Sequence, residues 1–211
     1  MYESDRERLV EILKGKGIKD KVVLNAFLHV ERHLFVSEAM IHHAYEDNAM
    51  PIGYGQTISQ PYTVAFMSES LNLKRNSNVL EIGTGSGYQA AILDKMGMNV
   101  YTIERNEKLY KKTKELLETL DIAVFTKLGD GTLGWAEHAP YDGIIVTAGA
   151  PAVPEKLKEQ LAEGGTLVIP TGDKKKQSLQ IIKKQSEDRF SYTEIPHFKF
   201  VPLIGREGWK E

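Results

Sequence analysis

Two glutamates and a cluster of glycines are the residues of this chain whose types and spacing best suit the binding of a cofactor. Glu81 shortly precedes Gly83, Gly85 and Gly87, and Glu104 ends the next apolar run. Glycines let the backbone turn sharply and let a ligand approach the main chain where a Cβ would collide. A helix that begins after such a turn offers free N–H groups to a carboxylate or a phosphate. The cluster, with Thr84 inside it, therefore predicts a nucleotide-cofactor site.

The spacing of these residues indicates which nucleotide is bound. The dinucleotide fingerprint is G-x-G-x-x-G, whereas the glycines here follow G-x-G-x-G. Glu81 would repel a pyrophosphate, but it suits the ammonium group at the methionine end of S-adenosyl-L-methionine. Glu104 can bind both hydroxyls of a ribose. We expect S-adenosyl-L-methionine rather than NAD, with one alternative open: the glycines make only a packing turn and Glu104 is a solvated strand end.

Thr57 and Ser59 are candidates for contact with a second substrate. They belong to the Gly- and Pro-containing stretch 45–61, whose lack of periodicity predicts a binding loop or lid. Pro61 is placed to begin a helix, so both hydroxyls would lie at a loop-to-helix junction where an anion can bind. The residues alone favour a simpler interpretation, in which Ser59 only caps this helix.

Two later positions are weaker candidates. Asp130 lies between two glycines after an apolar run, where it can accept a hydrogen bond from an adenine amino group or begin an ordinary turn. Thr147 lies among small residues at the end of the next apolar run, as expected where a substrate crosses the edge of a sheet.

Apolar runs that alternate with helical patterns must position these residues. Strands are expected at 79–82, 100–104, 123–128, 141–151 and 166–170. Helices are expected after Pro61 and Gly87 and at 107–120 and 154–161, where Gly164 and Gly165 stop the last helix. Two N-terminal helices are expected at 4–13, with Ser4 and Glu7 as a capping box, and at 20–29. A hairpin of 177–184 with 190–197 follows a turn that contains Lys174, Lys175 and Lys176.

This pattern predicts an α/β fold: a doubly wound, mostly parallel, Rossmann-like sheet with a C-terminal antiparallel hairpin and N-terminal helices. We expect one domain over 1–211. Residues 1–60 supply N-terminal helices and a substrate loop, 61–172 the cofactor-binding core, and 173–211 the hairpin and tail. Ligands bind such sheets at the carboxyl ends of the strands, where the glycine turn, Glu104, Asp130 and Thr147 would meet.

Composition narrows the class of function. A formal net charge of −2 gives no general attraction to nucleic acid or to an anionic membrane. The chain has no cysteine, so it has no disulfide, thiolate zinc site or cysteine nucleophile. It shows no apolar run long enough to span a membrane, and we expect a cytoplasmic protein. His29 and His33 flank Glu31, but the order H-x-E-x-H without a third ligand predicts no metal site.

Six motifs, taken in order, resemble the protein-L-isoaspartate (D-aspartate) O-methyltransferase family. They are GQTISQP at 55–61, VLEIGTGSGY at 79–88, GDG at 129–131, DGIIVTA at 142–148, GGTLVIP at 164–170 and FVPLIG at 200–205. The first and last are specific to this family, whereas the glycine motif occurs in many methyltransferases. The resemblance implies methyl transfer from S-adenosyl-L-methionine to the free carboxylate of L-isoaspartyl and D-aspartyl residues in damaged proteins and peptides, which begins their repair.

The resemblance also assigns roles. It implies that Ser59 is the active-site serine, which reverses the preference for a helix cap. The implied cofactor residues are Glu81, Gly83, Thr84, Gly85, Gly87, Glu104, Asp130 and Gly131, and Thr57, Ile58 and Thr147 are expected at the substrate. Gln60 and Tyr62 depart from some relatives, which have a small residue before the proline and a histidine after it. This departure would alter the peptide fit but not the reaction.

Three alternatives stay open at this point. The nearest is an S-adenosyl-L-methionine-dependent methyltransferase that acts on a small molecule or an RNA base. An RNA enzyme would usually show a basic face or an aromatic stacking platform, and neither is visible in this sequence. The others are an NAD-dependent oxidoreductase and a module that only senses its ligand. Our expectation remains a monomeric enzyme with isoaspartyl peptides and proteins as partners.

Overall fold

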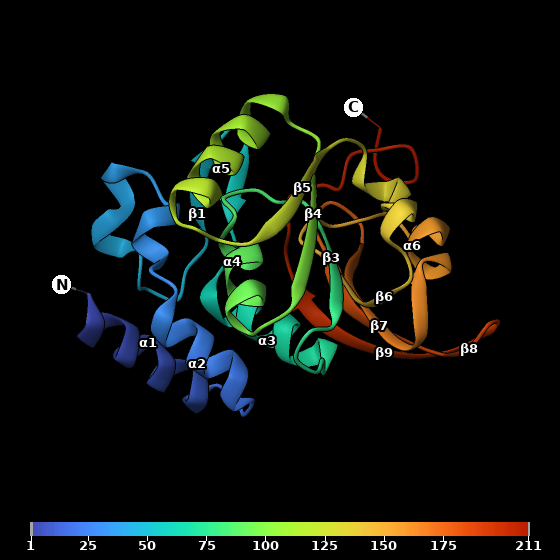
Figure 1. Ribbon diagram of the computed structural model, residues 1–211, viewed down its shortest axis with the longest axis horizontal. Helices are drawn as coiled ribbons and strands as arrows, with labels where there is room; N and C mark the ends of the chain where they lie inside the picture. The colour runs from blue at the N-terminus through green and yellow to red at the C-terminus, as the bar shows by residue number, and fades with distance from the viewer. Residues whose placement is uncertain (1, 211) are drawn as a thin grey trace.

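The computed structural model describes residues 2–210 and builds them around a seven-stranded sheet (Figure 1). The strands are β3 (Asn78–Ile82), β4 (Asn99–Glu104), β5 (Val124–Leu128), β6 (Tyr141–Val146), β7 (Leu161–Gly172), β8 (Gln177–Ser186) and β9 (Arg189–Phe198). Their order is β5-β4-β3-β6-β7-β8-β9. The pairings from β5 to β7 are parallel, and β8 is antiparallel to both β7 and β9. The expected fold is confirmed, and the hairpin extends the same sheet.

Helices cover both faces of this sheet. They are α1 (Glu3–Gly15), α2 (Lys21–His29), α3 (Pro61–Leu71), α4 (Tyr88–Lys95), α5 (Glu107–Thr119) and α6 (Glu155–Glu159), with 3-10 turns η1 (Arg32–Phe35), η2 (Glu38–His43), η3 (Gly131–Leu133) and η4 (Ala136–His138). In Figure 1, α1 and α2 lie together at the lower left, and α6 lies on the right beyond the sheet.

The alternation of side chains along β3 shows how the two layers form. Val79 packs into a hydrophobic cluster with residues of α1, α2, α3 and α4, whereas Leu80 packs into a second cluster that includes Leu157 of α6. Both β3 residues are fully buried. A strand buried on both faces has to be apolar throughout, so the charged Glu81 on this strand needs a special environment.

The N-terminal helices match the expected ranges, but only one of them starts as predicted. Asp20 caps α2 by accepting hydrogen bonds from the backbone N–H groups of Val22 and Val23. The predicted capping box is wrong, because α1 already begins at Glu3 with Tyr2 at its cap position and no side-chain cap bond. Ser4 therefore lies inside the first turn.

The stretch expected to be an irregular loop contains a small antiparallel hairpin. β1 (Met50–Gly53) pairs with β2 (Gln56–Ile58), and Tyr54 and Gly55 turn between them with φ of 54° and 69°. Met50 and Ile58 are paired partners and are both buried, so two short strands become stable through contact with the core. Strands this short show too few alternations for a periodic pattern to be visible.

The predicted stop of the last helix is also wrong. α6 ends at Glu159, and β7 has begun by Leu161, which pairs with Tyr141. Gly164 and Gly165 lie within β7, where the register with β6 shifts. A Cβ on Gly165 would lie 2.8 Å from the carbonyl oxygen of Ala162, so the glycines allow an irregular strand rather than end a helix.

Candidate active site

A cavity of about 200 Å³ opens at the carboxyl ends of β3, β4 and β6. This is the position that a doubly wound sheet offers to a ligand. Its walls include most of the predicted site residues, namely Thr57, Ile58, Ser59, Glu81, Gly83, Thr84, Gly85, Glu104, Gly131 and Thr147. Gly87 and Asp130 do not line it, and residues 201–204 of the tail close one side.

The glycine turn has the backbone geometry for which glycine was predicted. Gly83, Gly85 and Gly87 have φ of 93°, 54° and 87°. A Cβ on Gly83 would lie 2.6 Å from Oγ1 of Thr147, whose hydroxyl lies 2.7 Å from the Gly83 carbonyl oxygen and donates a hydrogen bond to it. Gly87 instead precedes α4, where a Cβ would lie 3.0 Å from Cγ2 of Thr113 on α5. Gly87 therefore serves helix packing, and Thr147 holds the turn in place.

Glu104 ties the end of β4 to the glycine turn. Its Oε2 accepts a hydrogen bond from the Gly85 N–H at 3.0 Å, and its Oε1 accepts one from the Asn106 N–H at 2.9 Å. The side chain is nearly buried and lines the cavity. Each carboxylate oxygen has two acceptor sites, so Glu104 can accept further hydrogen bonds from hydroxyl groups of a ligand.

Glu81 is a fully buried carboxyl group with one oxygen unused. Oε2 accepts a hydrogen bond from the Thr102 hydroxyl, which is also hydrogen-bonded to the hydroxyl of Thr84. Oε1 has no partner within residues 2–210. The pKa of Glu81 is raised to about 8, chiefly by burial. The hydrogen bond from Thr102 opposes this rise, and the nearby charge of Glu104 adds to it. A buried, unpartnered oxygen at a cavity wall fits a cationic donor such as an ammonium group.

Asp130 lies outside the cavity and uses its carboxylate within the protein. Oδ1 accepts hydrogen bonds from the N–H and the hydroxyl of Thr132, and Oδ2 accepts one from the Arg206 N–H at 2.7 Å. The carboxylate thus caps the start of η3, which agrees with the alternative that Asp130 begins an ordinary turn. It also holds the C-terminal tail in place through the Arg206 N–H. Gly131 does line the cavity, and a Cβ there would lie 2.4 Å from Cγ2 of Ile82.

A second space, which we call the cleft, adjoins the cavity and measures about 430 Å³. The two spaces share Thr57, Ser59, Thr147 and Val201, so these residues border both spaces, and we call the boundary that they form the passage. One wall of the cleft is a row of neighbouring aromatic rings, namely Tyr62, Phe66, Phe198 and Phe200. Ile58 is buried and borders the cavity rather than the cleft. The cleft can therefore take an apolar or peptide ligand next to the cavity.

Ser59 is not the cap of α3. The cap position belongs to Gln60, which makes no side-chain cap bond, so the simpler interpretation from the sequence is wrong. The capping acceptor comes from Asp47, whose Oδ1 accepts a hydrogen bond from the Tyr62 N–H at 2.7 Å and whose Oδ2 accepts one from Gln60 Nε2 at 3.0 Å. The hydroxyl of Ser59 is therefore not needed as a helix cap and can contact a ligand at the passage between cavity and cleft.

Arg32 holds the main chain at Ser59, and sequence reasoning missed it. Its guanidinium is fully buried, and Nη2 donates hydrogen bonds to the carbonyl oxygens of Ser59 at 2.9 Å and Asn48 at 3.3 Å. It also lies over the Tyr88 ring, 4.7 Å from the centroid. Burial lowers the pKa of Arg32, and Tyr88 opposes this shift. Its neighbours in the sequence, Glu31 and His33, are polar, so no local pattern marked Arg32 as a buried residue.

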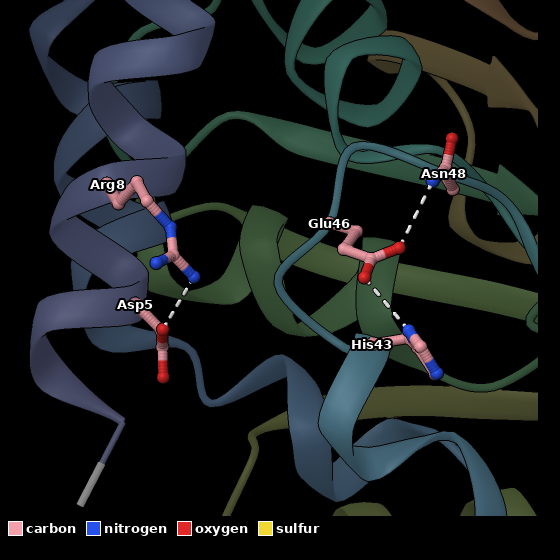
Figure 2. Close-up of polar contacts among 5 residues, drawn as sticks. All are labelled: Asp5, Arg8, His43, Glu46 and Asn48. Atoms are coloured by element: carbon pink, nitrogen blue, oxygen red, sulfur yellow. Dashed lines mark hydrogen bonds and ion pairs between the residues drawn. The ribbon is translucent and has the colours of Figure 1, made fainter.

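Neighbouring polar contacts order the segment that approaches Ser59. Figure 2 shows Glu46 between His43 and Asn48: its Oε1 is hydrogen-bonded to His43 Nδ1 at 2.8 Å, and its Oε2 accepts a hydrogen bond from Asn48 Nδ2 at 3.4 Å. The same view shows the pair of Asp5 and Arg8 on α1, which is exposed and remote from this contact. The Glu46 contacts thus stabilise the segment whose Asn48 carbonyl binds Arg32.

The histidines have other partners than a metal ion. His29 Nδ1 lies 2.8 Å from the Asn25 carbonyl oxygen, and His33 Nδ1 lies 2.7 Å from the Tyr45 hydroxyl. Within residues 2–210, no group of histidine, aspartate and glutamate side chains is arranged to hold a metal ion. Over the same range, no helix combines the length and the apolar character needed to span a bilayer.

Comparison with known proteins decides the family. The model of the protein-L-isoaspartate(D-aspartate) O-methyltransferase family matches residues 4–208. A protein-L-isoaspartate O-methyltransferase of Dictyoglomus thermophilum is 54% identical over 211 residues, which cover 100% of this chain and 96% of the relative. That of Chlorobaculum tepidum is 56% identical over 209 residues, which cover 98% and 97%. This chain belongs to the protein-L-isoaspartate O-methyltransferase family.

Solved structures agree with membership of the protein-L-isoaspartate O-methyltransferase family. One such enzyme superposes with a TM-score of 0.85 at 32% identity and covers 96% of this chain and 67% of that chain. A beta-aspartate methyltransferase from Plasmodium falciparum superposes with a TM-score of 0.81 at 29% identity and covers 94% and 98%. The latter structure is a complex with S-adenosyl-L-homocysteine. Family membership excludes the oxidoreductase alternative for this chain.

Proposed function

We propose that this chain transfers a methyl group from S-adenosyl-L-methionine to the free carboxylate of L-isoaspartyl and D-aspartyl residues in damaged proteins and peptides, and so begins their repair. The observation that carries the proposal is the passage at Ser59. There, a cavity lined by glycines and two acids meets a cleft with an aromatic wall. Such a passage brings two separately bound substrates into contact, as group transfer requires.

The cavity is assigned to the cofactor. Glu81, Gly83, Thr84 and Gly85 would hold its methionine end, with the unpartnered Oε1 of Glu81 as the acceptor for its ammonium group. Glu104 would accept hydrogen bonds from the ribose hydroxyls. Gly131 would lie beside the adenine. Gly87 and Asp130 would act indirectly: Gly87 allows the start of α4, and Asp130 holds η3 and the tail in place. When bound, S-adenosyl-L-methionine supplies an activated methyl group on a positively charged sulfur.

The cleft is assigned to the damaged peptide. A peptide carboxylate is already ionised at neutral pH, so the protein needs no general base. The Ser59 hydroxyl, with Thr57 beside it, donates a hydrogen bond that orients this carboxylate at the passage. Orientation of two reactants can supply roughly 7 to 11 kcal/mol of the barrier reduction. Arg32 and Asp47 act indirectly, because Arg32 fixes the Ser59 carbonyl group and Asp47 fixes the start of α3 that follows it.

The walls of the cleft fit a peptide with its side chains. Tyr62, Phe66 and Phe198 offer apolar contact area, and Gln60 and Tyr62 are the positions at which this chain departs from some relatives. Both positions line the cleft, which supports the expectation that the departure alters peptide fit. The aromatic wall also reduces the contact of the bound carboxylate with water.

The direct test is methyl transfer to a synthetic isoaspartyl peptide, with the same peptide containing normal aspartate as control. We expect transfer to the isoaspartyl peptide alone, and an additional D-aspartyl peptide tests the second substrate class. Transfer to neither isoaspartyl nor D-aspartyl peptide, with transfer to a small molecule or RNA instead, would contradict the proposal.

We further propose that the enzyme acts as a monomer in the cytoplasm. The cavity, the passage and the cleft are built by one chain, so catalysis needs no second subunit. The absence of cysteine makes the fold independent of an oxidising compartment. Size-exclusion chromatography with light scattering and cell fractionation test the two points separately.

A further inference from the structure

A third space extends the cleft along the C-terminal hairpin. This groove measures about 750 Å³ and is lined by residues of β8, β9 and the turn between β7 and β8. Residues 196–199 line both the cleft and the groove, so the two spaces adjoin where β9 ends. His197 has a φ of 73° there, at an irregular pairing of β9 with β8. A polypeptide that occupies the cleft can therefore continue into the groove.

Three lysines stand at the groove. Lys175 and Lys176 belong to the exposed turn before β8, and Lys199 follows β9. In the part of the chain that the structure describes, the ammonium groups of these lysines form no ion pair. Lys174 of the same turn lies over the Trp209 ring instead, 5.3 Å from its centroid.

The carboxylates near these lysines are already bound by other groups. Asp173 Oδ1 accepts hydrogen bonds from the backbone N–H groups of Lys175 at 2.6 Å and Lys176 at 2.7 Å. Glu194 is hydrogen-bonded by the side chains of Ser178 and Gln180, which lower its pKa. Three lysines and one carboxylate, Glu194, thus line the groove of a chain whose net charge is −2, so the groove is positive against the overall balance.

We infer that this groove binds the stretch of substrate polypeptide that flanks the isoaspartyl residue, and that it selects stretches with acidic side chains. The inference rests on the proposed function. An extended chain advances about 3.3 Å per residue, so a flanking stretch of a few residues spans the border between cleft and groove. Lysine ammonium groups without partners complement aspartate and glutamate side chains in that stretch.

A matched peptide series tests this preference. Each peptide carries one isoaspartyl residue, with three glutamates or three glutamines placed either before it or after it. An exposed ion pair is worth roughly 0.2 to 1 kcal/mol, which is about 1.5- to 5-fold per pair. We expect one of the two glutamate peptides to exceed its glutamine partner by about 3- to 10-fold in kcat/KM, with the advantage lost in high salt.

Charge-reversal variants assign the preference to the groove. Lys175→Glu with Lys176→Glu should abolish the advantage of the glutamate peptide and leave the glutamine peptide unchanged. Lys21→Glu with Lys112→Glu makes the same charge change at exposed positions on α2 and α5 and should preserve the advantage. Fluorescence anisotropy of the labelled peptides, with S-adenosyl-L-homocysteine present, should show the same order of affinities without turnover.

The outcomes are distinguishable. No advantage for either glutamate peptide, or an advantage that survives the Lys175 and Lys176 changes, would overturn the groove inference and leave the methyltransferase proposal intact. Failure to methylate all isoaspartyl peptides in the series would overturn the proposed function itself.

Discussion

Replacement of Glu81 by glutamine should make the protein more stable at alkaline pH. Burial raises the pKa of this carboxyl group to about 8 from an ordinary value of 4.5. Between these two values the folded state binds more protons than the unfolded state, so the free energy of unfolding falls as the pH rises. A shift of about 3.5 pKa units at 1.36 kcal/mol each corresponds to about 5 kcal/mol above pH 8.

Glutamine keeps the shape of this side chain but does not titrate. Its amide oxygen can accept the hydrogen bond that Thr102 donates to Glu81. We expect the difference in unfolding free energy between Glu81→Gln and the unmodified protein to grow by about 4 kcal/mol between pH 5 and pH 9. Denaturant unfolding at several pH values measures it, with the exposed Glu163→Gln as matched control. A difference that does not change with pH would refute the description of Glu81 as a buried neutral acid.

Three further predictions concern the cofactor and the passage. Binding of S-adenosyl-L-homocysteine near pH 7 should release a proton, because its ammonium group favours the charged form of Glu81. Calorimetry in buffers of different ionisation enthalpy measures the number of protons released. Binding without proton release would contradict the prediction. Ser59→Ala should lower kcat/KM for an isoaspartyl peptide by about 10- to 150-fold, because one hydrogen bond to a charged group is lost. The affinity for the cofactor should not change. Full activity of the variant would exclude the assigned role of Ser59. Arg32→Met should lower kcat/KM and also reduce the free energy of unfolding by about 1 to 3 kcal/mol, because the Ser59 and Asn48 carbonyl oxygens lose their donor. An unchanged kcat/KM in a folded variant would show that Arg32 only stabilises the fold.

Local patterns were sufficient to predict the sheet and the cofactor cavity. The order of strands and helices from Asn78 to Glu104 follows from apolar runs and glycines that are adjacent in sequence. Parallel strands necessarily bring their carboxyl ends together, so Gly83, Gly85, Glu104 and Thr147 meet at one cavity as predicted, whereas Gly87 and Asp130, which were expected there too, do not line it. Their roles in binding remain proposals.

Contacts between distant parts of the chain were not predictable. Arg32 reaches the Ser59 carbonyl across 27 positions, and Asp47 caps α3 across 15. Asp130 Oδ2 accepts a hydrogen bond from the Arg206 N–H across 76 positions, which no local pattern shows. Side chains that bind remote backbone groups leave no periodic signal in the sequence, so these contacts emerged only from the folded chain.

The central claim is that a cofactor cavity and a peptide cleft meet at Ser59. A crystal structure of the protein with S-adenosyl-L-homocysteine and an isoaspartyl peptide tests it most directly. We predict the cofactor product in the cavity between Glu81 and Glu104, and the isoaspartyl carboxylate within hydrogen-bond distance of the Ser59 hydroxyl. A cofactor product bound elsewhere, or a carboxylate remote from Ser59, would contradict the claim.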